Sequence, residues 1–208
     1  MPRLPLAVAA LLLTVSLAAC STPAPAADAP PSVSPPPAAP APTPTVQVPV
    51  APATIAPVTA VVPPSGVRID AIGIEVPVIP VGIEGEGFME LPPDPAIAGW
   101  YQYGPTPATG AGNTVISAHI DSPDYPIGPF ASLRDVPAGA EVVVASEDGS
   151  EARYAVESVT YYPKADLPTD QLFARVGPPT LVLITCGGEF DRSTGRYRDN
   201  VVLVATPF

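Results

Sequence analysis

Two residue types suited to nucleophilic chemistry occur once each in the C-terminal two-thirds of the chain, as His119 and Cys186. A thiol becomes an effective nucleophile when an acid or base lies within hydrogen-bond reach, and imidazole is the usual one. Each residue directly follows a strongly apolar run, residues 113–118 and 181–185. Taken singly, such a Cys or His is more often structural. Together they predict a cysteine nucleophile with a histidine acid/base.

Three arginines, Arg192, Arg196 and Arg198, lie between Cys186 and the last apolar run, residues 201–205. A guanidinium beside the nucleophile can stabilise the oxyanion of a tetrahedral acyl intermediate. The alternative for each arginine is that it only offsets an acidic surface. The chain shows no spacing typical of a metal site, because one His and one Cys cannot build one without several carboxylates. The sequence predicts no cofactor.

Short β-branched runs separated by turn-forming residues must position these side chains. No window of 12 or more residues keeps a helical period, and short helices are expected only near residues 130–136 and 170–176. The sequence therefore predicts a mostly β domain of seven or eight strands, a closed barrel or a sandwich. Pro77 and Pro80 indicate an edge or bulged strand. The expected strands are residues 67–72, 74–81, 113–120, 141–145, 152–161, 181–185 and 201–205.

Composition limits the folded part to residues 67–208. Of the 33 prolines in the 208 residues, 17 lie among the first 64, and residues 4–67 contain no Lys, Arg or aromatic side chain. The remaining 142 residues are enough for one domain with one core. This domain holds 8 basic and 19 acidic residues and so carries the full net charge of −11. Such a field repels phosphate backbones and anionic headgroups, which argues against nucleic acid as a partner.

Residues 1–20 have the parts of an export signal: Arg3, an uncharged apolar run, and small residues before Cys20. The run is shorter than the roughly 20 apolar residues of a membrane-spanning helix. Leu17-Ala18-Ala19-Cys20 resembles the lipobox of bacterial lipoproteins, in which the cysteine is acylated and becomes the new N-terminus. The alternatives are an uncleaved or conventionally cleaved signal. If Cys20 carries lipid, Cys186 is the only thiol of the exported chain.

Residues 21–66 are rich in Pro, Ala, Thr and Val and favour extended polyproline conformations. They predict a disordered or semi-rigid spacer that holds the domain off the membrane. The N-terminal anchor would then be the contact with the membrane.

Two stretches around the candidate residues resemble a known family. Thr185-Cys186-Gly187-Gly188-Glu189-Phe190-Asp191, followed by Tyr197-Arg198-Asp199-Asn200-Val201-Val202, is similar to sortases of the actinobacterial class F group. So is Ala118-His119-Ile120-Asp121-Ser122 leading to Gly128-Pro129-Phe130. Sortases are cysteine transpeptidases of Gram-positive cell surfaces, and the resemblance covers residues 67–208.

The resemblance implies an eight-stranded sortase β-barrel with His119 as general acid/base and Cys186 as nucleophile. It also implies an arginine near the last strand as transition-state stabiliser. The position that holds this arginine in many sortases falls on Asn200 here, so the role is assigned to Arg198, which would share its strand face. Arg192 and Arg196 are the alternatives. Asp121 is a candidate for orienting His119, against the alternative of an ordinary turn acid.

The implied reaction is acyl transfer at the outer face of the cell membrane. Cys186 would attack a sorting motif near the C-terminus of a secreted protein, and a peptidoglycan-type amine would resolve the thioacyl enzyme. The usual anchor of the family is a transmembrane helix, which the lipobox-like N-terminus of this chain does not match. An L,D-transpeptidase, another cysteine peptidase and a wall-binding lipoprotein module with an inert Cys186 are the alternatives.

Overall fold

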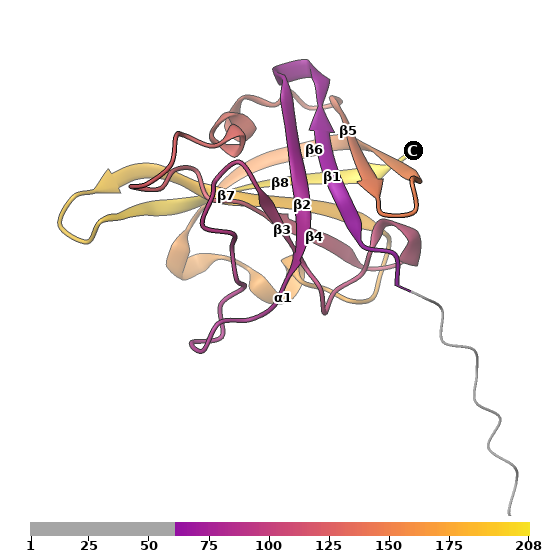
Figure 1. Cartoon of the computed structure of the whole chain (residues 1–208), viewed down its shortest axis with the longest axis horizontal. Helices are drawn as coiled ribbons and strands as arrows, with labels where there is room; N and C mark the ends of the chain where they lie inside the picture. The colour runs from indigo at the N-terminus through magenta and orange to yellow at the C-terminus, as the bar shows by residue number, and fades with distance from the viewer. Residues whose placement is uncertain (1–60) are drawn as a thin grey trace, which may run out of the picture. The chain divides into compact units, whose positions relative to one another are not determined.

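A computed structural model describes residues 61–208, and the expectations for residues 1–60, including the lipid site at Cys20 and most of the spacer, lie outside the described residues. Eight strands form a closed barrel in the order β1-β2-β3-β4-β7-β8-β6-β5 (Figure 1). The predicted fold, an eight-stranded β-barrel with short helices, is confirmed. The strands are β1 (Pro64–Ile69), β2 (Ile74–Val81), β3 (Ala98–Tyr101), β4 (Asn113–Ser117), β5 (Glu141–Ser146), β6 (Glu151–Pro163), β7 (Thr180–Asp191) and β8 (Arg196–Pro207).

The alternation of apolar side chains along the strands fills the barrel. In β2 the burial alternates residue by residue, with Ile74, Val76 and Val78 inside, because successive strand side chains point to opposite faces. The 3₁₀ helix η3 (Pro129–Asp135) adds Phe130 and Leu133, both fully buried in the same core. The predicted helix near residues 130–136 is this element. The other predicted helix is a single turn, α1 (Thr169–Leu172).

The strand β2 lies between β1 and β3 in the closed barrel, and its pairings with both are regular, so the prediction of an edge or bulged strand from its prolines is wrong. Its first half, up to Pro77, pairs with β1, and its second half, Val78–Val81, pairs with β3. Each proline therefore stands where β2 has a ladder partner on one side only. A residue without an amide hydrogen is tolerated there because no second ladder requires the missing donor.

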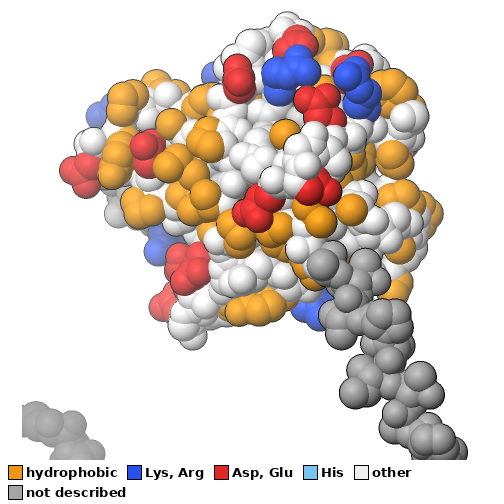
Figure 2. Space-filling view, turned by 45° about the vertical axis from the view of Figure 1, so that its right-hand side comes forward, with side chains coloured by type: hydrophobic (Ala, Val, Ile, Leu, Met, Phe, Trp, Pro, Cys, Tyr) orange, Lys and Arg blue, Asp and Glu red, His pale blue; other side chains and the backbone are white. Residues whose placement is uncertain are grey.

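The strand β3 was not predicted, and β7 and β8 are longer than predicted. Ala98–Tyr101 is too short to show an alternating pattern. β7 and β8 continue past the buried residues as a hairpin that extends beyond the barrel at the left of Figure 1. Within residues 61–208, no helix is long and apolar enough to cross a membrane. Figure 2 shows one face of the molecule, where basic and acidic side chains lie next to one another near the top and hydrophobic ones are scattered among polar ones.

Candidate active site

The parallel strands β4 and β7 bring His119 and Cys186 to the same rim of the barrel. The pairing runs from Asn113 with Thr180 to Ser117 with Ile184 at one constant offset. His119 and Cys186 are separated by this same offset, two positions beyond the last pair. Neighbouring strands lie about 4.8 Å apart. The register of two buried strands therefore brings His119 and Cys186 to neighbouring strand ends.

Two buried side-chain hydrogen bonds hold these strand ends together. The Ser117 hydroxyl donates to the Ile184 carbonyl at 2.9 Å, and the Thr185 hydroxyl donates to the Ala118 carbonyl at 2.8 Å. Both bonds join residues immediately before the candidate pair. In a buried setting such reciprocal bonds are costly to break, because each would leave an unsatisfied polar atom. Thr185, the threonine of the Thr-Cys motif, thus helps to hold the ends of β4 and β7 together.

His119 and Cys186 both line one groove of about 510 Å³ at this rim, and both are partly buried. The groove also includes the loop after His119, the residue that follows β6, and the β7–β8 hairpin. Its ionisable side chains are His119, Asp121, Lys164, Cys186, Arg196 and Tyr197.

Burial lowers the pKa of His119 below its usual value. The positive charge of Lys164 acts in the same direction, while the carboxylates of Asp121 and Glu84 oppose it. Loss of water around an imidazole disfavours its charged form. At neutral pH His119 is therefore held largely as a neutral imidazole, which can accept a proton from a thiol.

Asp121 is bound to a different partner from the one predicted. Its carboxylate accepts a 2.6 Å hydrogen bond from the Tyr197 hydroxyl, and the Phe190 ring packs edge-on against Tyr197 with centroids 5.0 Å apart. This bond raises the pKa of Tyr197 to about 12. Among the described residues, no hydrogen bond joins Asp121 to His119. Asp121 instead ties the loop after His119 to the β7–β8 hairpin.

The three predicted arginines occupy different positions on that hairpin. Arg196 lines the groove. Arg198 lies 3.4 Å from the Glu189 carboxylate with 62% of its side chain exposed, and it is not among the residues that line the groove. Arg192 is exposed in the turn. The residue directly opposite Cys186 in the ladder is Asn200.

The two glycines after Cys186 serve the hairpin itself. A Cβ atom on Gly187 would lie 2.5 Å from Cγ2 of Val201. Gly188 has a φ of +73°, a left-handed conformation that favours glycine, at the irregularity in the β7–β8 register. Close packing within the chain therefore requires glycine at both positions.

Lys164 is a groove residue that the sequence reasoning missed. It begins the 3₁₀ turn η4 (Lys164–Asp166) directly after β6, and its ammonium lies 3.6 Å from the Cys186 sulfur. A lysine between a proline and an alanine matches no motif. One signal was available, because Lys164 is the only lysine in the chain.

A sortase domain family model matches residues 67–208, the whole barrel apart from its first residues. This chain belongs to the sortase family. Sortases are cysteine transpeptidases, so the family confirms the predicted enzyme class. It favours the sortase interpretation over the L,D-transpeptidase and wall-binding alternatives. No curated protein sequence matches the chain.

Solved sortase structures share the fold at low sequence identity. The pilus-related sortase C of Group B Streptococcus has a TM-score of 0.51 and 18% identity over 69% of this chain and 66% of that chain. The Pilus Island 1 sortase C2 of Group B Streptococcus has a TM-score of 0.52 and 18% identity over 69% and 72%. Sortase A from Corynebacterium diphtheriae has a TM-score of 0.50 and 18% identity over 69% and 59%.

The match to these structures is partial in length. This chain spans 66% of the first of them, and at such identities the likeness shows the fold alone. The three belong to sortase classes C and A, so membership of class F stays a prediction. Within residues 61–208, no group of three or more His, Cys, Asp or Glu side chains is placed to hold a metal ion.

Proposed function

We propose that this sortase joins secreted proteins to a cell-wall amine through a thioacyl intermediate on Cys186. The observation that carries the proposal is the common register of β4 and β7, which brings the only histidine of the chain and the only cysteine of the barrel into one groove. If His119 and Cys186 had only a packing role, neither the common register nor the shared groove would be required.

In the first half-reaction the Cys186 sulfur attacks a backbone carbonyl in the sorting motif of the substrate. His119 takes the thiol proton and gives it to the leaving amine as the peptide C–N bond breaks and the C–S bond forms. The lowered pKa of His119 supports this role, because a neutral imidazole can accept that proton. In the second half-reaction an acceptor amine attacks the thioester, the C–S bond breaks, and the thiol is restored.

We assign the stabilisation of the tetrahedral intermediate to Arg198. Its only ion pair within residues 61–208 is with Glu189, and both side chains are largely exposed. An exposed pair of this kind contributes little free energy, so the guanidinium is free to turn towards a bound substrate. Arg196, which lines the groove, is the alternative, and Arg192 is a weaker one.

The substrates we propose are secreted proteins with a C-terminal sorting motif, and the acceptor is a peptidoglycan-type amine. The acidic domain argues against nucleic acid as a partner. The enzyme would act outside the cytoplasm, held at the outer face of the membrane through acylated Cys20 and the spacer 21–66. We further propose that it is a class F sortase of the actinobacterial type.

Incubation of the full chain with a peptide library and an amine nucleophile tests the reaction. Mass spectrometry should find peptides cleaved at one motif and joined to the amine, together with a transient acyl adduct on Cys186. Cleaved peptides without the amine would indicate a hydrolase. The absence of any adduct or product would refute the proposed function.

The intact mass of the protein extracted from membranes tests the anchor separately. We expect a chain that begins at Cys20 and carries acyl groups. A chain that begins near Met1 without acyl mass would show that the lipoprotein prediction is wrong.

A further inference from the structure

The only lysine of the chain lies against the only cysteine of the barrel. The Lys164 ammonium is 3.6 Å from the Cys186 sulfur. The strand register explains the approach, because Tyr162 of β6 and Cys186 of β7 both pair with Asn200 of β8. Lys164 follows Tyr162 by two residues, at the start of η4 just past the end of β6, and therefore lies near the same rim of the barrel as Cys186.

The charge surroundings of Lys164 are unusual for this acidic domain. Acidic residues outnumber basic ones by 19 to 8 between residues 67 and 208, yet no carboxylate of the described chain lies within ion-pair distance of Lys164. The one carboxylate that lines the groove, Asp121, is bound to Tyr197. The ammonium is thus directed at the thiol with no carboxylate to neutralise it.

We propose that Lys164 is a further catalytic residue of this sortase, whose ammonium stabilises negative charge on the Cys186 sulfur. It would act twice, on the thiolate that attacks the substrate carbonyl and on the thiolate that leaves when the acceptor amine resolves the thioester. In the second step the electron pair of the broken C–S bond returns to sulfur beside the ammonium, and the proton that the acceptor amine gives up restores the thiol through His119. This role rests on the proposed transpeptidase function.

The expected effect is modest because Lys164 is exposed to solvent, which screens its charge. Four other titratable groups line the same groove, His119 and Asp121 from the end of β4 and the loop after it, and Arg196 and Tyr197 from β8. Loss of one exposed cation at this distance should slow a reaction of the thiolate roughly 3- to 10-fold near neutral pH.

Alkylation of Cys186 by iodoacetamide in the full chain measures this effect without any substrate. The rate is followed on the peptide that contains Cys186, by mass spectrometry, from pH 5 to 10. Lys164→Met should lower the rate at pH 7 roughly 3- to 10-fold and move the midpoint of the rate profile to higher pH. Lys164→Arg, which keeps the positive charge, should restore most of the rate.

Arg153→Met is the matched control, since it removes a cation near the start of β6, the strand that ends directly before Lys164. Its alkylation profile should equal that of the wild type. A wild-type profile for Lys164→Met would overturn the proposal, and so would equal slowing in Lys164→Met and Lys164→Arg. Failure of the proposed function is seen separately, as a wild-type enzyme that alkylates normally but forms no acyl adduct with peptides.

Discussion

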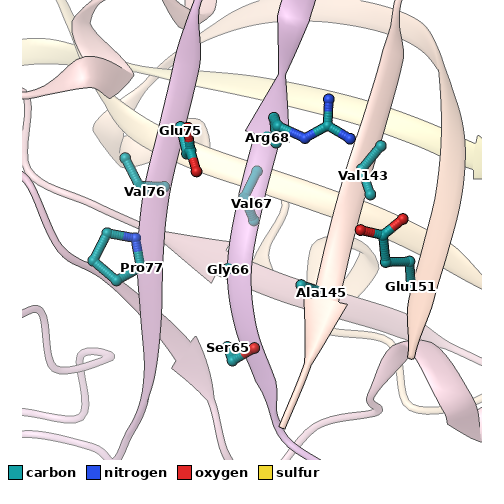
Figure 3. A pocket seen from close by; sticks show the side chains of 10 residues that line it. All are labelled: Ser65, Gly66, Val67, Arg68, Glu75, Val76, Pro77, Val143, Ala145 and Glu151. Atoms are coloured by element: carbon teal, nitrogen blue, oxygen red, sulfur yellow. The ribbon is translucent and has the colours of Figure 1, made fainter. Parts of the chain in front are cut away.

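Two hollows on the barrel surface have very different chemistry. One is the groove at the rim with His119 and Cys186, and the other, of about 370 Å³, lies on the outer wall across β2, β1 and β5 (Figure 3). The wall hollow holds Arg68 between Glu75 and Glu151, and Arg68 pairs with Asp70.

The charged side chains of the two hollows have different partners, and this difference indicates where chemistry can arise on this fold. In the wall hollow Arg68 stands opposite Glu75 in the β1–β2 ladder, and its guanidinium forms a salt bridge with Asp70 just past the end of β1. The rim groove combines residues of the β7–β8 hairpin with His119 and Lys164, which lie just past the ends of β4 and β6, and there a lysine faces a thiol instead of a carboxylate. The two hollows therefore differ in the partners of their charged side chains.

Removal of the nucleophile should give the largest difference in activity between a substitution in the rim groove and one in the wall hollow. Cys186→Ala should abolish the acyl adduct and all transpeptidation, because no other thiol lies in the groove. The free energy of unfolding should change little, since the side chain is only partly buried. Arg68→Ala in the wall hollow is the matched control and should leave the turnover unchanged. Full activity in Cys186→Ala would end the proposed mechanism.

Removal of Arg198 should have the next largest effect. Arg198→Ala should lower the rate of acylation by roughly two to three orders of magnitude, the usual result of losing one oxyanion donor, with the fold intact. Arg192→Ala and Arg196→Ala should be milder. Single-turnover formation of the acyl adduct measures all three. Near-normal acylation in Arg198→Ala, with an inactive Arg196→Ala, would move the role to the arginine that lines the groove.

The hydrogen bond from Tyr197 to Asp121 joins the loop after His119 to the β7–β8 hairpin. Its loss tests whether the geometry of the rim groove depends on this bond. Tyr197→Phe removes the donor to Asp121 and should lower the free energy of unfolding by about 1 kcal/mol, because the bond is only partly buried. Transpeptidation should fall several-fold as His119 becomes less well positioned. Urea denaturation and turnover are the measurements. Tyr103→Phe, at an exposed tyrosine, should change neither.

The same division explains what the sequence could reveal. The barrel and most of its strands follow from apolar alternation, and His119 and Cys186 follow from their position after two buried runs. The constant offset of β4 and β7 then brings them together. Tyr197 lies on β8 and Lys164 directly after β6, strands whose register depends on the whole closed sheet, so no local pattern could predict that these two residues line the groove.

The sequence contains one signal for Lys164, because it is the only lysine of the chain. The same kind of uniqueness distinguishes the histidine and the cysteine of the barrel. Lys164 was overlooked because a lysine beside a thiol is not a known motif, although its charge is what a thiolate needs.

The smallest predicted effect concerns stability in acid, where the rim and the wall should again differ. The pKa of His119 is lowered in the folded protein by burial, so the unfolded chain binds a proton more readily. The stability contributed by the neutral imidazole is therefore present above the ordinary histidine pKa of about 6.5 and is lost as the pH falls through the lower folded value.

His119→Gln removes this titration while carboxylates elsewhere still titrate. Between pH 8 and 5 the free energy of unfolding of the wild type, measured by urea denaturation, should fall more than that of His119→Gln. The difference should be less than about 1 kcal/mol, because solvent screens the charge of a half-buried group. Arg68→Ala should follow the wild-type curve, and an equal fall in wild type and His119→Gln would show that burial does not hold His119 neutral.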